Sequence, residues 1–324
     1  MTSENTMIDH QADTIDVRVC EILECGRDTK AYNLQPLTGQ PLPMAEAGAH
    51  IDLILPTGLI RQYSVILGQK RTEGYWIAVK KDVNSRGGSL QIHSNVVVGT
   101  ILKVKAPRNN FPLDEGAPHS VLIAGGIGIT PIVSMINRLV ALGKSWELYY
   151  ACRSRADLSL LEEIPAGQNA HFHLDDESDG KYLDLSKIVG GAPAGTHFYC
   201  CGPLPLMAAF DLATADIADQ RKHVEYFTAR ESAPPQGGFR IKLARSGKVL
   251  NVPQGGTILD ALKEAGISVE HSCAEGICGT CETTVLAGVP DHRDSVLTPS
   301  ERAANNTIMV CCSGSKSEEL VLDL

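Results

Sequence analysis

The stretch HSCAEGICGTC, residues 271–281, places three cysteines within nine residues and decides how the last part of the chain folds. Cys273, Cys278 and Cys281 follow a C-x4-C-x2-C spacing, and Cys311 lies 30 positions further on. Plant-type [2Fe–2S] sites use this spacing and take their fourth cysteine from a distant segment. The sequence therefore predicts a two-iron cluster held by these four thiolates.

The fourth ligand has two candidates, because Cys311 and Cys312 are adjacent. The segment NTIMVCC contains an apolar strand, Thr307 to Val310, that would deliver Cys311 at its end, so we favour Cys311. A zinc site is the main alternative, but zinc prefers paired two-residue spacings and this cluster motif contains one C-x2-C. A set of buried free thiols is the remaining alternative.

The residues around the cysteine motif predict a small β-grasp ferredoxin domain over residues 238–324. The segment FRIKLARSGKVLNVP alternates and turns at Ser246-Gly247, which is a hairpin pattern. In TILDALKEAG, Thr257 is a candidate N-cap and Gly266 a candidate helix stop. Hairpin, helix, cluster loop and late strand follow one another in the order of a ferredoxin domain.

A doubly wound α/β domain is predicted over residues 113–229. HSVLIAGGIGITP contains an apolar strand, a glycine-rich turn and the start of a helix at Pro131, and further strands and a helix alternate after it. Such a turn brings the backbone close to a pyrophosphate at a helix N-terminus. The turn alone is a weak signal, but Arg153 and the segment Cys201-Gly202-Pro203 are also placed at strand ends, where this fold binds ligands.

The first 112 residues read as short strands with turns between them, which suggests a small antiparallel β-barrel. In RQYS, Arg61 offers a fork for a phosphate, Tyr63 a ring for a flat heterocycle and Ser64 a hydroxyl for a ring nitrogen. Gly87-Gly88 with Ser89 could cradle a phosphate. Together these features predict a flavin site, and RESAPPQGGF contains the expected linker, residues 230–237.

The composition of the chain excludes several classes of partner and of cysteine chemistry. The chain has 324 residues, a net charge of −9, ten cysteines and no run of 18 apolar residues. The acidic balance argues against nucleic-acid or membrane-surface partners, since both attract basic patches. A polar N-terminus without a signal-peptide pattern predicts a cytoplasmic protein, in which clustered cysteines favour metal binding over disulfides.

Across nearly its whole length the chain resembles the phthalate dioxygenase reductase family, which includes vanillate O-demethylase reductases, within the ferredoxin–NADP reductase superfamily. The motifs that carry the resemblance, in order, are RQYS, RGGS, PRNNFPL, AGGIGITP, YCCGP, DHRDSVLTPSE and ELVLDL. The resemblance implies an FMN-binding barrel, a central domain for a nicotinamide dinucleotide and a C-terminal ferredoxin domain.

The resemblance also implies site residues. The implied FMN contacts are Arg61, Tyr63, Ser64, Val79, Lys80, Gly87, Gly88, Ser89, Thr130 and Phe227. The implied NAD contacts are Gly125, Gly126, Gly128, Arg153, Cys201, Gly202 and Pro203. Ser64, Thr130 and Cys201 would lie beside the reacting rings as the catalytic residues, and Glu225 near the nicotinamide.

Two sequence features point in opposite directions on whether NADH or NADPH binds. Arg153 and Arg155 follow the second strand of the predicted sheet, where a 2′-phosphate could bind. Asp175 and Asp176 follow the third strand and would repel that phosphate. The resembled family favours NADH, so we expect NADH rather than NADPH.

The expected activity is electron transfer from NADH through FMN and the cluster to a separate terminal oxygenase of the Rieske type, because FMN converts a two-electron hydride into single electrons. The chain itself has no Rieske ligand pattern. A cytochrome P450 or another acceptor is an alternative, and a non-catalytic zinc-stabilised binding protein is an alternative of another class. A monomer is expected, since transient electron-transfer partners use small interfaces.

Overall fold

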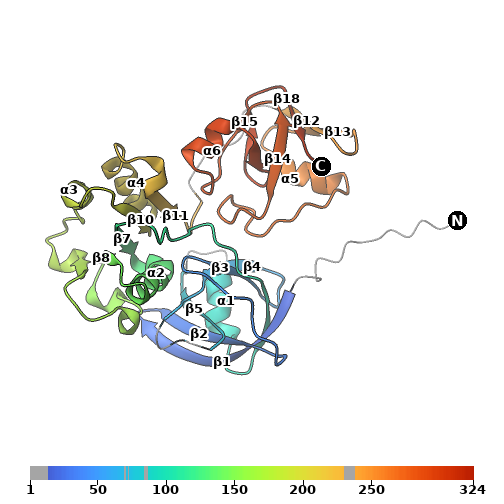
Figure 1. Cartoon of the computed structure of the whole chain (residues 1–324). Coiled ribbons are helices and arrows are strands. Elements are labelled where there is room, and N and C mark those ends of the chain that lie inside the picture. Colours follow the sequence, from blue (N-terminus) through green and yellow to red (C-terminus); the bar gives the residue numbers. More distant parts are fainter. Residues whose placement is uncertain (1–13, 69–70, 72, 84–86, 230–237) are drawn as a thin grey trace.

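The structure, a computed structural model, describes residues 14–68, 71, 73–83, 87–229 and 238–324. These residues form three domains in chain order (Figure 1). The predicted boundaries fall between β6 (Ile101–Lys105) and β7 (His119–Gly125) and between β11 (Lys222–Glu225) and β12 (Phe239–Leu243). The predicted linker, residues 230–237, lies outside the described residues.

The first domain is a six-stranded antiparallel sheet in the order β4-β3-β6-β1-β2-β5. Its strands are β1 (Thr14–Gly26), β2 (Thr29–Pro36), β3 (His50–Ile54), β4 (Ile60–Ser64), β5 (Tyr75–Lys80) and β6 (Ile101–Lys105). The two end strands are drawn together, because the backbone N–H of Ile66, just after β4, donates to the carbonyl of Trp76 in β5 at 2.7 Å. Inward side chains such as Val17, Ile51 and Val104 fill the interior.

One helix of this domain, α1 (Gly88–Asn95), was not predicted from the sequence. Its buried residues are Gly88 and Ile92, so it lacks the wide apolar stripe that usually identifies a surface helix. The helix begins directly after Gly87, whose φ of 86° lies in the left-handed region that glycine adopts without strain.

The second domain is a five-stranded parallel sheet in the order β11-β10-β7-β8-β9, as the doubly wound prediction requires. Its strands are β7 (His119–Gly125), β8 (Ser145–Cys152), β9 (Ala170–Leu174), β10 (His197–Cys201) and β11 (Lys222–Glu225). Its helices are α2 (Ile129–Ala141), α3 (Leu185–Gly191) and α4 (Leu204–Ala213), with short 3-10 turns at Gly126–Gly128, Arg155–Asp157, Leu161–Glu163, Asp175–Glu177 and Asp219–Arg221. Helix α2 begins two residues before the predicted Pro131, because a 3-10 turn leads straight into it.

The third domain is a mixed five-stranded sheet in the order β13-β12-β18-β14-β16. Its strands are β12 (Phe239–Leu243), β13 (Val249–Val252), β14 (Glu282–Ala287), β16 (Thr307–Met309) and β18 (Glu319–Leu322), with a small pair β15 (Pro290–Asp291) and β17 (Gly314–Ser315). Its helices are α5 (Ile258–Glu264) and α6 (Pro299–Ala304). The predicted hairpin is present, and the Thr257 side chain caps α5 by accepting from the N–H of Asp260.

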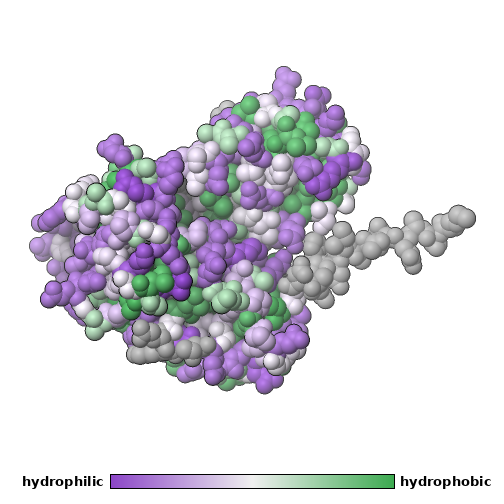
Figure 2. Space-filling view, in the orientation of Figure 1, coloured by the Kyte–Doolittle hydropathy of each residue, from purple (hydrophilic) through white to green (hydrophobic). Residues whose placement is uncertain are grey.

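The apolar cores do not coincide with the three domains, because one core is shared by the first two. One core joins Ala31, Ile66 and Trp76 of the first domain to Ile132 and Tyr150 of the second. The third domain has a core of its own, and Figure 2 shows it as a separate lobe joined to the rest over a narrow region. Within the described residues, no helix is long and apolar enough to cross a membrane.

Candidate functional site

The four predicted cluster cysteines converge although they come from two segments. Cys273, Cys278 and Cys281 lie in the loop between α5 and β14, and Cys311 follows β16. All four are buried, with at most 5% of each residue exposed. The N–H of Cys273 donates to Cys278 Sγ at 3.4 Å, and thiol hydrogen bonds join Cys311 to Cys273 and to Cys281.

Hydrogen bonds between these thiols shift their pKa values in opposite directions: bonds with the Cys278 and Cys311 side chains lower the pKa of Cys273, whereas bonds with Cys273 raise the pKa values of Cys278 and Cys311. Metal binding needs the thiolate form. The N–H of Glu275 also donates to Cys273 Sγ at 3.3 Å, and the Thr280 hydroxyl lies 3.2 Å from Cys278 Sγ. Four convergent thiols supplied with backbone donors fit a [2Fe–2S] cluster.

Cys312 is placed differently from its neighbour Cys311. A β-carbon at Gly276 would come within 2.5 Å of Cys312 Sγ, so the loop glycine and this sulfur are in close contact. Cys311 instead contacts Cys273 and Cys281, which favours it as the fourth ligand. In the described part of the chain, no three His, Cys, Asp or Glu side chains are arranged around a single metal ion. It is therefore the convergence of all four cysteine sulfurs that indicates a two-iron cluster.

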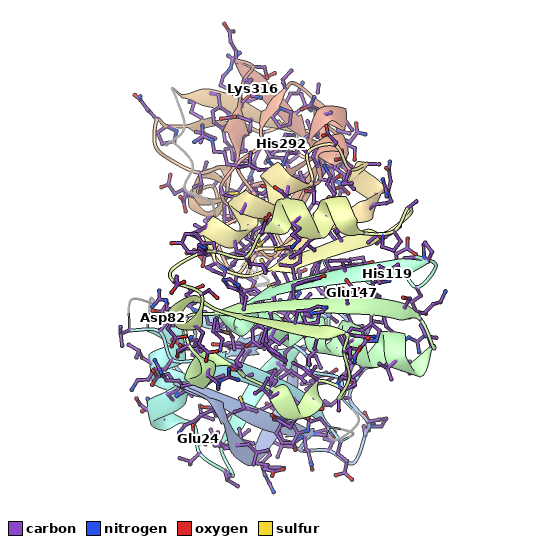
Figure 3. The ribbon with its side chains drawn as sticks, turned by 90° about the vertical axis from the view of Figure 1, so that its left-hand side faces the viewer. Glu24, Asp82, His119, Glu147, His292 and Lys316 are labelled. Atoms are coloured by element: carbon purple, nitrogen blue, oxygen red, sulfur yellow. The ribbon has the colours of Figure 1, made fainter. Side chains whose placement is uncertain are left out.

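The predicted flavin residues of the first domain lie along two segments that approach each other. Arg61 and Gly88 are close enough that a β-carbon on Gly88 would sit 2.7 Å from Arg61 Nε. Ser89 lies in the first turn of α1, and the N–H of Asp82, labelled in Figure 3, donates to its hydroxyl at 3.1 Å. Gly87, Gly88 and Ser89 thus open a helix beside a guanidinium group, an arrangement that fits a phosphate. This is the feature of the chain that best matches the FMN phosphate.

The remaining predicted flavin residues are spread around this segment. Tyr63 is half-buried against the barrel core, and burial raises the pKa of its phenol. Val79 is buried in that core, and its carbonyl lies 2.8 Å from His93 Nε2. Lys80 Nζ lies 3.9 Å from Asp157 Oδ1 of the second domain. Phe227 follows β11 and is 38% exposed.

The predicted nucleotide residues gather at the carboxyl ends of β7 and β10. A β-carbon on Gly125 would lie 2.6 Å from Pro203 Cδ, and one on Gly128 would lie 2.1 Å from the Cys201 carbonyl oxygen. A β-carbon on Gly202 would lie 3.0 Å from Gly125 Cα. These contacts leave no room for side chains at Gly125, Gly128 and Gly202, so the turn packs directly against the end of β10. A glycine turn that leads into a helix N-terminus suits a pyrophosphate.

The three predicted catalytic residues meet where the first two domains join. Thr130 Oγ1 in α2 donates to Ser64 Oγ in β4 at 3.4 Å, and both residues are buried. Cys201 ends β10, where burial raises the pKa of its thiol well above the usual value. The thiol is therefore neutral and is no nucleophile. Their place beside the bound rings stays a prediction.

A buried pair of titratable groups lies at the same junction: Glu225, which the resemblance places near the nicotinamide, and His50, which was not singled out from the sequence. Glu225 pairs with Cys201 across the sheet, and its Oε1 lies 3.9 Å from Nδ1 of His50 in β3. Burial raises the pKa of Glu225 to about 8 and lowers that of His50 to about 4. Near neutral pH both groups are consequently uncharged, and their contact is no ion pair.

The arginines weighed for a 2′-phosphate differ in their surroundings. Arg155 Nη2 is paired with Glu177 Oε2 at 2.9 Å, and Glu177 follows Asp175 and Asp176 in one 3-10 turn. Arg153 is exposed, and its carbonyl accepts from the N–H of Asp176. The acidic turn thus occupies one candidate arginine, which favours NADH over NADPH.

Two further side chains, missed from the sequence, join the first domain to the cysteine loop. Gln62 Nε2 donates to Ser272 Oγ, and Asn110 Nδ2 donates to the Cys278 carbonyl at 2.9 Å. Gln62 lies inside RQYS, and Asn110 inside PRNNFPL. Both motifs were quoted from the sequence, but neither residue was singled out.

Comparison with protein families gives two matches. Residues 241–315 match the 2Fe-2S iron-sulfur cluster binding domain, and residues 122–211 match the oxidoreductase NAD-binding domain. The first match contains all four converging cysteines, and the second contains the glycine turn and Cys201.

Three relatives align over almost their entire lengths. A protein named phenoxybenzoate dioxygenase subunit beta, from Ectopseudomonas oleovorans, is 48% identical and the alignment covers 96% of this chain and 97% of the relative. Tetrachlorobenzoquinone reductase from Sphingobium chlorophenolicum is also 48% identical, covering 96% and 98%. Vanillate O-demethylase oxidoreductase from a Pseudomonas strain is 44% identical, covering 96% and 100%.

Two solved structures share the whole architecture. Phthalate dioxygenase reductase, described as a modular structure for electron transfer from pyridine nucleotides to [2Fe-2S], superposes with a TM-score of 0.70 at 36% identity, covering 96% of this chain and 98% of that one. An intact self-sufficient cytochrome P450 monooxygenase superposes with a TM-score of 0.88 at 38% identity. The alignment covers 96% of this chain but 41% of the monooxygenase.

Proposed function

The chain belongs to the phthalate dioxygenase reductase family, and on that premise we propose that it delivers electrons to a separate terminal oxygenase with a Rieske-type centre. It is an NADH-dependent oxidoreductase of the flavin and iron–sulfur type, the reductase component of an oxygenase system, with FMN, NADH and a [2Fe–2S] cluster as its cofactors. FMN supplies the conversion of a hydride pair into single electrons.

The chain's own residues then have distinct tasks. We assign the FMN phosphate to Arg61 and the start of α1, since these residues form a glycine-lined cradle for an anion. The dinucleotide pyrophosphate is assigned to the turn Gly125–Gly128. Ser64, Thr130 and Cys201 would hold the two rings in register, because productive hydride transfer depends on geometry and exclusion of water.

One observation carries the proposal. The loop with Cys273, Cys278 and Cys281 contacts the flavin domain through hydrogen bonds from Gln62 and Asn110. The predicted flavin site, the nucleotide turn and the cysteines would thus form an internal relay, and a relay that ends in a one-electron carrier needs a partner that accepts single electrons. The oxygenase assignment of that partner is supported by relatives named as components of phenoxybenzoate dioxygenase and vanillate O-demethylase.

A second acceptor is supported by another relative. The protein named tetrachlorobenzoquinone reductase is as similar to this chain as the dioxygenase subunit, at 48% identity each. A chlorinated quinone accepts electrons directly and needs no docking surface for a protein. We therefore keep a soluble quinone as the competing acceptor, and a cytochrome P450 as a third acceptor, because a chain of that class contains the same three domains.

Acceptor assays with the loaded protein separate these possibilities. The purified reductase, reduced anaerobically with NADH, is mixed with a Rieske-type oxygenase component, a soluble P450 or tetrachlorobenzoquinone, and the rate of acceptor reduction is followed. We expect the Rieske centre to be reduced fastest at equal acceptor concentration. Faster reduction of the quinone, with no reduction of the Rieske centre, would replace the oxygenase assignment by a quinone reductase.

A further inference from the structure

We propose that Gln62 and Asn110 are positioning residues that hold the cluster loop against the flavin domain and so set the rate of electron transfer from flavin to cluster. The inference rests on the reductase function given above. It concerns residues to which neither the family comparisons nor the sequence motifs assign a role.

Gln62 joins the two domains through a single amide nitrogen. Its Nε2 donates to Asp52 Oδ1 at 2.8 Å within the flavin domain and to Ser272 Oγ in the third domain. Ser272 precedes the ligand Cys273. An amide nitrogen has two protons, and both are used here, one to anchor the side chain and one to hold the loop.

The anchor of Gln62 is itself fixed in place. Asp52 is 1% exposed, and its Oδ1 also accepts from Arg108 Nη2 at 3.0 Å. Asp52 and Gln62 are direct neighbours across β3 and β4. A buried carboxylate that is held by a guanidinium group can only accept hydrogen bonds, so it turns the amide nitrogen of Gln62, rather than the oxygen, toward itself and the loop.

Asn110 makes the second connection, on the other side of the loop. Its Nδ2 donates to the carbonyl of the ligand Cys278 at 2.9 Å. Gly279 permits this approach, because its φ is +74° and a β-carbon there would lie 3.1 Å from Asn110 Nδ2. The glycine next to the ligand thus serves the contact between the domains as well as the shape of the loop.

An ion pair extends the same contact. Lys105 Nζ at the end of β6 lies 3.9 Å from Glu270 Oε1. All three contacts therefore reach residues 270–278, the segment that contains two cluster ligands. They come from β4, which also carries Arg61 and Ser64, from the end of β6 and from the segment that follows β6.

The step that this contact serves is a simple exchange of one electron. The reduced flavin loses one electron and the oxidised cluster gains it, and no bond forms or breaks between them. Such a transfer slows steeply as the distance between donor and acceptor grows. A small displacement of residues 273–278 is consequently enough to change the rate, since positional errors of about 1 Å can cost up to about 100-fold in enzyme rates.

The test uses the full-length protein loaded with FMN and cluster, in which Gln62→Leu, Asn110→Leu and the double variant are compared with the unaltered chain. Asn110→Leu keeps about the same side-chain size and removes the donor to the Cys278 carbonyl without adding a charge. Lys103→Ala is the matched control, because Lys103 lies on β6 as Lys105 does but pairs with Asp16 inside the first domain. Anaerobic stopped-flow mixing with NADH follows flavin and cluster absorbance separately.

We expect flavin reduction to stay within about twofold in every variant and the flavin-to-cluster phase to slow by about tenfold in each single variant and further in the double variant. Hydrogen exchange of peptides covering residues 270–281 should rise, while the cluster midpoint potential stays unchanged. An unchanged flavin-to-cluster rate in the double variant overturns the proposal. Slowing accompanied by a shifted cluster potential also overturns it, because the residues would then tune the cluster rather than position it.

The same traces separate this inference from the function on which it rests. If NADH reduces no flavin in the unaltered protein, the reductase assignment fails before any variant is compared. If the flavin is reduced and the cluster is not, the relay fails. Only a protein in which both phases are present can report on Gln62 and Asn110.

Discussion

The flavin domain packs against the nucleotide domain through a shared apolar core, whereas polar side chains connect it to the cluster loop of the ferredoxin domain. Buried apolar contacts between two domains fix their relative position, because separating them exposes apolar surface at about 25 cal/mol per Å². A few hydrogen bonds and an exposed ion pair contribute far less free energy to holding two domains together.

The difference matches the two reactions. Hydride transfer requires two rings at contact distance and in a defined orientation, and the shared core keeps Ser64 beside Thr130 for that purpose. Transfer of one electron needs a short distance but no defined orientation of two rings. The molecule thus combines an apolar junction between the first two domains with a polar junction to the ferredoxin domain.

The largest expected effect comes from disabling the third domain alone. Cys311→Ser should abolish the cluster and all transfer to the acceptor, while NADH reduces the flavin at the unaltered rate, because Cys311 lies in the separate core of the third domain. Visible absorbance, iron content and anaerobic flavin reduction provide the measurements. Cys312→Ser is the matched control and should retain the cluster; loss of the cluster in that variant instead would exchange the assignments of the two cysteines.

The next largest effect is expected from a substitution in the shared core, which tests whether the first two domains unfold as one unit. Phe111 is 1% exposed in the shared core and packs edge-to-face on Tyr199 of β10 at 6.0 Å. Phe111→Ala should lower the free energy of unfolding of both domains together by about 3–5 kcal/mol. Denaturant unfolding followed by flavin release and by far-ultraviolet dichroism provides the measurement.

The control for this prediction is the neighbouring residue. Asn110 is exposed and faces the third domain, so Asn110→Ala should change the same transition by about 0.5 kcal/mol or less. Equal destabilisation by both substitutions would contradict the contrast between the two junctions.

We expect the stability of the protein to depend on pH through buried groups at the junction of the first two domains. Because the pKa of Glu225 rises from its usual 4.5 to about 8 on folding, the folded state binds more protons than the unfolded state between these values, and stability falls as pH rises through this range. The pKa of His50 falls to about 4, so His50 opposes this trend below about pH 6.5 and leaves Glu225 dominant above it.

The corresponding variant is Glu225→Gln, which keeps the shape and removes the titration. The unaltered protein should lose up to about 2 kcal/mol of stability between about pH 6.5 and 8, and the variant should lose little. Denaturant midpoints of the loaded protein at several pH values give the comparison. A decline of the same size in both proteins would assign the pH effect to other groups.

The smallest effect on electron transfer is expected from the exposed ion pair between the flavin domain and the ferredoxin domain. The Glu270 side chain is 68% exposed, so its pair with Lys105 should contribute about 0–1 kcal/mol to docking. Lys105→Ala should slow the flavin-to-cluster phase by less than about tenfold and reduce its dependence on salt. A slowing as large as that of the Gln62 and Asn110 double variant would shift the main docking role to the ion pair.

Much of this molecule could be predicted from local sequence. The spacing of Cys273, Cys278 and Cys281, the Ser246-Gly247 turn and the glycines before α2 each report a conformation that neighbouring residues determine. These features led to the three domains and to the family. They say nothing about which surfaces of the domains meet.

The features that were missed, namely the roles of Gln62 and Asn110 and the burial of Glu225, depend on contacts between domains. Gln62 stands between Arg61 and Tyr63 in RQYS, and strand alternation turns it to the other face, toward Asp52 and Ser272. Asn110 lies in an exposed loop and acquires its contact from a segment 168 positions away. Glu225 gains its pKa shift from burial that the strand sequence alone does not reveal.

The most direct test of the electron relay is an anaerobic titration of the loaded protein with NADH and then with a stronger reductant, followed by visible absorbance. We predict that flavin and iron–sulfur bands both bleach, with a capacity of three electrons per chain, two for FMN and one for the cluster. A capacity of two electrons, with flavin bleaching and no iron–sulfur band, would contradict the relay through Cys273, Cys278, Cys281 and Cys311.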